Sequence, residues 1–204
     1  MKEASCVLLC TGGIGSGKSV VVRVFQELGL PAYDCDRAAK ECYDRDPQLL
    51  AEVVALCGKE VLDAGGRLDR AALSRRIFGD PALLAAVEDR VHPAVIRDFE
   101  NWKKQQESGL VVIESAILLE KPQFAGLMDY TLAVTAPEAL RVVRVMARDG
   151  VSETQVRRRM AAQWSDEQRA ARADFVWENN DRTALLPTVL SIIDKIKRRW
   201  KKQI

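Results

Sequence analysis

The most constraining feature of this chain is the glycine-rich segment at residues 12–19, which reads GGIGSGKS and fits the pattern G-x-x-x-x-G-K-[ST] in full. An apolar run at residues 6–10 precedes it and is typical of a buried strand, and residues 20–28 can continue as a helix. Because glycines lack Cβ, the backbone can turn until consecutive N–H groups point into one concavity, and the new helix adds its positive N-terminal end. Strand, glycine loop and helix together predict a site for the phosphate chain of a nucleotide.

Within this loop, Lys18 is expected to reach the β- and γ-phosphates, and the hydroxyl of Ser19 is expected to ligate the Mg²⁺ that accompanies the nucleotide. The alternative is a glycine-rich turn that fits the pattern by chance, and the strand and helix on either side count against it. The motif indicates a nucleoside triphosphate but identifies neither the reaction nor the acceptor. The residues predicted to bind the nucleotide in this loop are Gly13, Ile14, Gly15, Ser16, Gly17, Lys18 and Ser19.

With 204 residues, of which 48% are hydrophobic, the chain is long enough for one α/β domain with a good core. Its 31 Lys and Arg against 29 Asp and Glu leave a net charge of +2, which gives no reason to expect a nucleic acid or an acidic membrane as a partner. The five cysteines form no C-x-x-C pair, so we expect reduced thiols of a cytoplasmic protein. A single histidine, His92, excludes a His-based metal cluster. We expect a monomer or a weak homo-oligomer.

Three acidic residues follow the expected strands. Residues 31–33 lead into a short strand that closes on Asp34 and Asp36, which are two apart and so can project to the same side. In doubly wound sheets, ligands bind at this carboxyl-terminal edge. Asp34 could instead cap the helix that follows, whereas Asp36 is expected in the site. Glu114 ends the apolar strand at residues 110–114 and is a candidate for holding Mg²⁺ through water.

Between these strands, residues 37–108 show an interrupted helical pattern. One helix is expected to start with Asp80 as its N-cap and Pro81 at its first position. It is expected to end or bend at His92, because the residue before Pro93 is pushed out of the α region. An insertion of this length exceeds what a crossover requires, so we expect a module that recognises another molecule.

An arginine-rich segment follows the expected fourth strand. Arg141, Arg144 and Arg148 lie on one face of a predicted helix, and a second helix that opens at Ser152 carries three more arginines at residues 157–159. Arginines on surface helices are usually solvated. In a chain with a triphosphate site, however, phosphoryl transfer needs mobile cations that screen charge on the transferred group. The segment is therefore predicted to be a lid.

These elements predict an α/β fold of the P-loop nucleotide-kinase type, with three layers and a mainly parallel sheet of about five strands. We expect a single domain over residues 1–204. Its parts are a core at residues 1–36, 109–138 and 166–204, an acceptor-binding insertion at about 37–108 and a lid at about 139–165.

Several separated stretches together resemble the dephospho-coenzyme A kinase family, and the likeness covers nearly the whole chain. The glycine loop alone is shared by countless proteins, whereas its joint occurrence with a D-x-D pair, a Leu-Asp-Arg segment, a His-Pro pair and the lid is specific. The stretches that carry the likeness are residues 11–19, 28–31, 34–36, 68–73, 77–78, 92–93 and 117–120, together with Arg144, Arg148, Asp149, Gln163, residues 173–176 and Asn179.

The resemblance implies transfer of the γ-phosphoryl group of ATP, with Mg²⁺, to the ribose 3′-hydroxyl of dephospho-coenzyme A. It implies that Asp36 takes the hydroxyl proton and that Arg144 stabilises charge on the transferred group, with Lys18 as the third catalytic residue. Arg148 and Asn179 are expected to complete the ATP site. The implied substrate contacts are Thr11, Asp34, Arg75, His92 and Glu114.

At one position the chain departs from the family. The family usually has Asp followed soon by Pro-Leu-Leu, where this chain has Glu114 followed by Ser-Ala-Ile-Leu-Leu. Two roles therefore stay open for Glu114, a Mg²⁺-bound water or an acceptor contact.

Three other functions fit parts of the sequence. A nucleoside or nucleotide kinase of the same fold would share the loop, although the large insertion favours a bulkier acceptor. A GTPase switch is disfavoured, because the D-x-x-G match at residues 63–66 falls inside the insertion and the chain has no Asn-Lys-x-Asp segment. A non-catalytic nucleotide-binding module would not need both Asp36 and Arg144.

Overall fold

The computed structural model describes residues 5–180 and 182–200. The chain as described divides into two compact units, Met1–Asp34 with Gln106–Ile204, called here the sheet unit, and Cys35–Gln105, called the helical unit. Each unit is considered by itself. The helical unit occupies the part of the chain where the sequence predicts an insertion, while the organisation into core, insertion and lid of one domain stays a prediction.

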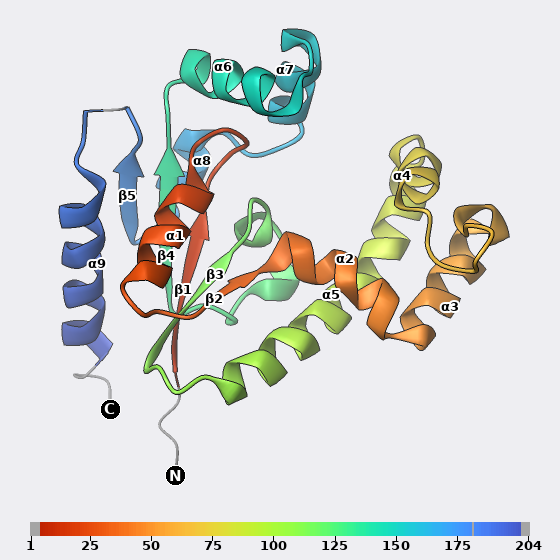
Figure 1. Cartoon of the computed structure of the whole chain (residues 1–204), viewed down its shortest axis with the longest axis horizontal. Coiled ribbons are helices and arrows are strands. Elements are labelled where there is room, and N and C mark those ends of the chain that lie inside the picture. The colour runs from red at the N-terminus through yellow and green to blue at the C-terminus, as the bar shows by residue number, and fades with distance from the viewer. Residues whose placement is uncertain (1–4, 181, 201–204) are drawn as a thin grey trace. The chain divides into compact units, whose positions relative to one another are not determined.

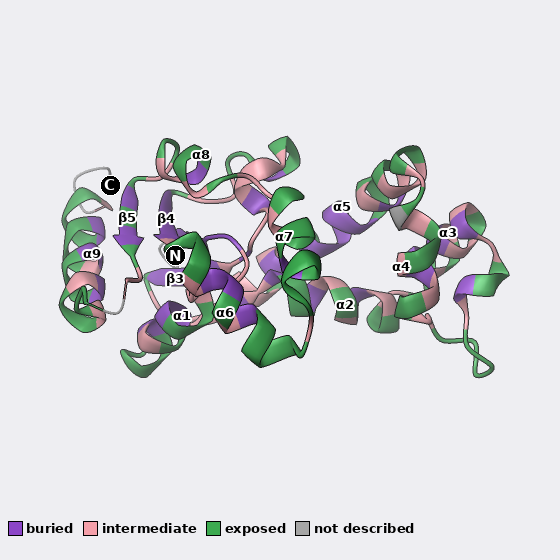
Figure 2. Cartoon of the chain, turned by 90° about the horizontal axis from the view of Figure 1, so that it is seen from above, coloured by how far each residue is buried: buried purple, intermediate pink, exposed green. Residues whose placement is uncertain are grey.

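Within the described residues, the sheet unit contains five strands that pair in parallel in the order β2-β3-β1-β4-β5 (Figure 1). The continuous apolar runs form the inner strands and are buried, as expected for a parallel sheet covered on both faces (Figure 2). The predicted α/β fold with a parallel sheet is confirmed. The strands are β1 (Cys6–Thr11), β2 (Ala32–Asp34), β3 (Leu110–Glu114), β4 (Tyr130–Thr135) and β5 (Phe175–Glu178).

Helices α1 (Lys18–Glu27) and α9 (Leu185–Trp200) contact each other and pack against the strands. Phe25 of α1 and Ile196 of α9 are fully buried in the same core cluster. Burial of such a side chain stabilises the fold by about 1.5–3 kcal/mol. The remaining elements of the sheet unit are α6 (Glu138–Asp149), α7 (Glu153–Ala161), α8 (Asp166–Ala170) and the 3₁₀ turns η2 (Leu118–Glu120) and η3 (Pro122–Phe124).

Helices α6 and α7 have a small core of their own. Val142 and Val145 of α6 pack with Val156 of α7. Ser152 caps α7 in a capping box with Gln155, as its position before the arginine-rich run indicates. The glycine at residue 150 ends α6 in the left-handed conformation, which suits a residue without Cβ.

The helical unit consists of α2 (Cys35–Arg45), α3 (Pro47–Cys57), the 3₁₀ turn η1 (Lys59–Val61), α4 (Arg70–Phe78) and α5 (Pro81–Gln105). Helix α5 begins at Pro81 as predicted. An end or a bend was expected at His92; the end is wrong, because the helix continues through Pro93, and the bend stays a prediction. Buried side chains lie on both sides of this proline, among them Val91 and Phe99, while Pro93 itself is exposed. Their packing outweighs the roughly 3 kcal/mol that an interior proline costs a helix.

The acidic pair Asp34 and Asp36 does not lie on one strand. β2 ends at Asp34, and Asp36 lies in the first turn of α2, where the helix N-terminus favours a negative charge. The expected projection of both side chains to the same side relied on strand alternation, and this premise is wrong because Asp36 is helical; the projection itself stays a prediction. Asp34 belongs to the sheet unit, and Asp36 belongs to the helical unit.

The expectation of thiols without disulfides is also met in the described part of the chain. All five cysteines are buried free thiols. Among residues 5–180 and 182–200, no helix combines the length and apolar character needed to cross a bilayer.

Candidate active site

The glycine loop connects the carboxyl end of β1 to α1. Gly15 and Gly17 have φ angles of 79° and 96°, a region in which a side chain would be strained. The amide of Ser16 donates to the carbonyl of Gly13 at 3.1 Å, which tightens the turn. Helix α1 begins at Lys18, directly after Gly17 as its N-cap, so the positive end of the helix faces the loop. The arrangement suits an anion such as a phosphate chain.

Ser19 and Glu114 meet at the carboxyl edge of the sheet. The hydroxyl of Ser19 donates to Oε1 of Glu114 at 2.7 Å. Glu114 is the last residue of β3 and pairs in register with Cys10 of β1 and with Asp34 of β2. The parallel strands therefore bring the Ser19 hydroxyl and the Glu114 carboxylate together, with Asp34 beside them.

The donor set at this edge fits Mg²⁺, which prefers oxygen ligands and usually binds through one or two protein groups plus phosphates and water. In the part of the chain that the structure describes, no group of three or more His, Cys, Asp or Glu side chains could hold a metal ion.

Asn179, just beyond β5, forms a hydrogen bond to the glycine loop. Its Nδ2 donates to the carbonyl of Ser16 at 2.9 Å, and its Oδ1 accepts from Arg144 at 3.3 Å. A Cβ on Gly17 would lie 2.3 Å from the Asn179 amide, so this close approach requires glycine in addition to the positive φ. The structure thus brings Arg144 and Asn179, both predicted for the site, to the loop. The Lys18 ammonium lies 3.5 Å from the Gly13 carbonyl.

The three arginines of α6 lie in different environments. Arg141 is only 6% exposed, Arg144 is half-buried and Arg148 is exposed. Arg148 donates two hydrogen bonds, of 2.7 and 3.2 Å, to Asp149. These bonds are the main cause of a raised pKa for Arg148 and a lowered pKa for Asp149. The alternative of solvated surface arginines is wrong for Arg141, which is buried, and the predicted lid stays a prediction.

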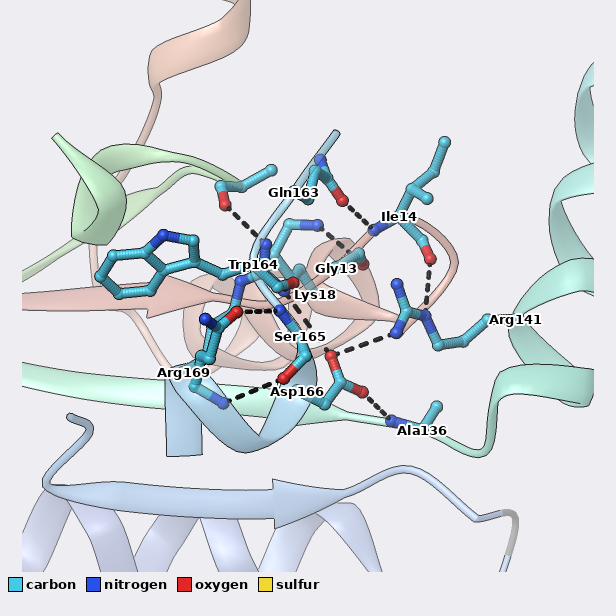
Figure 3. A network of polar contacts seen from close by, with 12 residues as sticks. Gly13, Ile14, Lys18, Ala136, Arg141, Gln163, Trp164, Ser165, Asp166 and Arg169 are labelled. Carbon is cyan, nitrogen blue, oxygen red and sulfur yellow. Dashed lines mark hydrogen bonds and ion pairs between the residues drawn. The ribbon is translucent and has the colours of Figure 1, made fainter. Parts of the chain in front are cut away.

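Arg141 belongs to a network of polar contacts at the base of α6 (Figure 3). Its Nε donates to the carbonyl of Ile14 at 2.9 Å, and its Nη1 forms a 3.2 Å ion pair with Asp166. The Oε1 of Gln163 accepts from the amide of Ile14, also at 2.9 Å. The network therefore connects the glycine loop to the segment that joins α7 and α8.

The network continues through a second buried arginine. Arg169 is completely buried and forms ion pairs of 2.6 Å with Glu120 and 3.7 Å with Asp166. It also donates to the carbonyl of Trp164, whose amide donates to Glu120 at 3.1 Å. Burial lowers the pKa of Arg169, and the charge of Glu120 opposes this effect.

The sequence patterns did not point to Asp166 or Arg169, and Gln163 and residues 117–120 were noted only for the family resemblance. The available signal was a capping box of Ser165 and Gln168, next to an acid and an arginine three residues apart. That signal predicts a short helix. It does not predict that Arg169 would be buried or that Asp166 would pair with Arg141.

Two residues at the end of β1 are buried beneath the loop. The pKa of Cys10 is raised to about 12, mainly by burial and also by the charge of Glu114, while the charge of Lys18 acts to lower it. The thiol is therefore protonated at neutral pH and is a poor nucleophile. Thr11, a predicted substrate contact, is 0% exposed and presents no surface to a ligand in this structure.

The other predicted residues lie in the helical unit. Asp36 on α2 and Arg75 on α4 are exposed, whereas His92 on α5 is buried. Because this unit is separate from the one that holds the glycine loop, their roles toward an acceptor stay predictions.

Comparison with known proteins gives consistent matches. A family described as Dephospho-CoA kinase matches residues 6–184. A dephospho-CoA kinase from Porphyromonas gingivalis is 40% identical over 190 residues, which is 93% of each chain. A solved structure from Thermus thermophilus is 36% identical, with a TM-score of 0.84, and covers 94% of this chain and 97% of its own. A dephospho-CoA kinase structure from Campylobacter jejuni shares the fold at 21% identity, with a TM-score of 0.67 and the same coverage.

Proposed function

The chain belongs to the dephospho-CoA kinase family, and from this premise we propose that it transfers the γ-phosphoryl group of ATP to the ribose 3′-hydroxyl of dephospho-coenzyme A. The products are coenzyme A and ADP, so the reaction is the last step of coenzyme A synthesis. The observation that carries the proposal is a complete phosphate-binding loop whose Ser19 hydroxyl bonds to Glu114 at the carboxyl edge of the sheet.

In this proposal, the amides of the loop and the ammonium of Lys18 hold the phosphates of ATP. The residues that would hold Mg²⁺ are Ser19 and, through water, Glu114, and the cation would neutralise charge on the β- and γ-phosphates. Arg148 and Asn179 complete the ATP site. Arg144, which Asn179 holds at 3.3 Å, stabilises the charge that develops on the transferred group.

Asp36 acts as the general base. It takes the proton of the 3′-hydroxyl while the hydroxyl oxygen forms a bond to the γ-phosphorus. The bond from the γ-phosphorus to the bridging oxygen breaks, and its electron pair stays on ADP. In support, only one residue separates Asp36 from Asp34 at the end of β2, so covalent geometry keeps its Cα within about 7 Å of that strand end.

The acceptor contacts are proposed for Thr11, Asp34, Arg75 and His92, with Glu114 as a further candidate. The proposed partners are ATP and dephospho-coenzyme A, and the proposed state is a cytoplasmic monomer or weak homo-oligomer. A net charge of +2 and five free thiols are consistent with this environment.

A panel of acceptors tests the reaction. Purified protein is mixed with ATP, Mg²⁺ and one acceptor at a time: dephospho-coenzyme A, a nucleoside or a nucleoside monophosphate. ADP release and the product mass are then measured. We expect phosphorylation of dephospho-coenzyme A. Activity on a nucleoside monophosphate and none on dephospho-coenzyme A would refute the assignment, and ATP binding without any transfer would indicate a non-catalytic module.

Replacement of Asp36 by asparagine tests the proposed base. We expect turnover to fall about 100-fold or more while ATP still binds, the size expected for loss of a positioned base. The matched control is Asp44→Asn, because Asp44 is another exposed acid of α2 and its salt bridge is with the exposed Arg70. Turnover of this control should stay close to that of the unmodified protein. If Asp36→Asn abolishes ATP binding in a folded chain, Asp36 is a nucleotide ligand instead.

A further inference from the structure

Both backbone polar groups of Ile14 are bonded by side chains from distant parts of the chain. The amide donates to Oε1 of Gln163 at 2.9 Å, and the carbonyl accepts from Nε of Arg141 at 2.9 Å. Figure 3 shows both bonds at the turn of the glycine loop. Because the amide and the carbonyl of one residue belong to consecutive peptide planes, the two bonds orient the backbone on both sides of Ile14.

Arg141 cannot move away from the loop without cost. Its side chain is 7% exposed, and its partner Asp166 is 15% exposed. Asp166 also accepts from the amide of Ala136 at 3.2 Å, and it lies 3.7 Å from Arg169. Withdrawal of the Arg141 guanidinium would weaken the pairing of a largely buried carboxylate, which is strongly unfavourable.

The same guanidinium explains why residue 13 is glycine. Gly13 is not among the positive-φ glycines, in contrast to Gly15 and Gly17, so its backbone conformation does not exclude alanine. A Cβ at this position would lie 2.1 Å from Nη2 and 2.7 Å from Cζ of Arg141. Glycine is required here by the space that the guanidinium occupies.

We propose that Gln163 and Arg141 are positioning residues for ATP binding, and that Gly13 is glycine in order to admit Arg141 to the loop. The two side chains, called here the Ile14 clamp, act on ATP through the shape of the loop. This inference rests on the use of ATP proposed above and does not depend on the acceptor. ATP affinity is therefore measured by calorimetry without an acceptor, so an error in the acceptor would leave the test intact.

A double-mutant cycle tests the collision between residue 13 and Arg141. The variants are Gly13→Ala, Arg141→Met and the combination of both, each in the full chain. We expect each single variant to raise the Kd for ATP about 10-fold or more, the size expected for loss of a hydrogen bond from a charged donor. The double variant should bind ATP no more weakly than Arg141→Met alone. If the double variant raised the Kd for ATP about 100-fold, the product of the two single effects, the proposal would be overturned, because the two substitutions would then act independently.

Gly12 provides the control for this cycle. A Cβ on Gly12 would lie 2.3 Å from the carbonyl oxygen of Val134, a backbone atom that Arg141→Met does not remove. The loss of affinity caused by Gly12→Ala should therefore persist in the Arg141→Met background. If Arg141→Met restored ATP affinity equally in the Gly12→Ala and Gly13→Ala variants, the proposed collision between residue 13 and Arg141 would be overturned.

The other residue of the Ile14 clamp is tested by Gln163→Met, which removes the acceptor for the Ile14 amide. This variant leaves the buried Arg141 unchanged. We expect the Kd for ATP to rise about five-fold, the size of one neutral hydrogen bond, with unchanged binding stoichiometry. The control is Gln168→Met, because Gln168 accepts from Ser165 at 2.8 Å in the same segment. Its Kd should stay within about two-fold. A Gln163→Met variant with lower stoichiometry and Tm but unchanged Kd would overturn the proposal, because that result indicates a merely structural role.

Discussion

Replacement of Arg169 by methionine should destabilise the sheet unit strongly. Arg169 is completely buried, and its 2.6 Å ion pair with Glu120 is shielded from water, since the Glu120 side chain is 12% exposed. Methionine replaces the apolar stem of the arginine and fills much of its volume, but it leaves Glu120 without its nearest cation. It also removes the hydrogen bond to the Trp164 carbonyl.

The magnitude follows from the burial of the pair. Removal of one partner of a buried ion pair costs about 3–5 kcal/mol, because the remaining charge stays desolvated. The matched control is Arg198→Met on α9, where Arg198 is 76% exposed and pairs with Asp194 at 2.9 Å. An exposed pair one helical turn apart contributes only about 0.3–0.5 kcal/mol. The loss in free energy of unfolding should therefore be about six or more times larger for Arg169→Met than for Arg198→Met.

A third variant separates charge from packing. Glu120→Gln in the Arg169→Met background removes the buried charge and retains an oxygen that can accept from the Trp164 amide. We expect it to recover about 1–3 kcal/mol, the cost of an unsatisfied buried polar group. No recovery would indicate that the loss in Arg169→Met comes from packing.

The assay is equilibrium unfolding in urea, with the free energy of unfolding obtained by linear extrapolation. Tryptophan fluorescence and circular dichroism are recorded together, because coincident transitions are needed to treat a chain with two compact units as two-state. An Arg169→Met loss below about 1 kcal/mol, no larger than that of Arg198→Met, would refute the reasoning. It would show that the network does not desolvate the charge of Glu120.

Two further predictions concern titratable groups. All five thiols are buried, and burial raises the pKa of Cys10 to about 12. Iodoacetamide at pH 8 should therefore leave the native chain unmodified and should label all five cysteines in urea. An adduct on Cys10 of the native chain, detected by mass spectrometry, would contradict this prediction. The Arg148 hydrogen bond lowers the pKa of Asp149 below its ordinary 3.8, so the stabilisation is present above that value and is lost as the pH falls through the folded-state pKa. The difference in urea midpoint between Asp149→Asn and the unmodified protein should therefore narrow from pH 7 to pH 3, whereas a constant difference would count against the hydrogen bond.

Much of the architecture could be predicted because its signals are local. Residues 12–19 carry a loop pattern that depends on glycine conformations, and the apolar run at residues 110–114 reads as a strand covered on both faces. Both appear in the structure where expected. The position of Glu114 at a carboxyl strand end followed from the same pattern, and the parallel register then placed it against Ser19.

The errors arose where distant contacts outweighed local preferences. Pro93 predicts a helix end or a bend because of its effect on the preceding residue, and the end does not occur, because buried side chains on both sides of Pro93 keep α5 continuous. The D-x-D pair suggested strand alternation, whereas the chain turns into α2 at Cys35. Neither outcome is encoded by the residues next to the position in question.

By itself, the sequence determined that this chain has a phosphate-binding loop between a buried strand and a helix, in a parallel α/β fold. The tertiary structure decided which of three similarly spaced arginines would be buried. Arg141 and Arg148 carry the same charge on one helix, and they differ because Arg141 meets Asp166 and the carbonyl of Ile14. A charged group is stable in the interior only where partners replace its water, and those partners come from segments far apart in the chain.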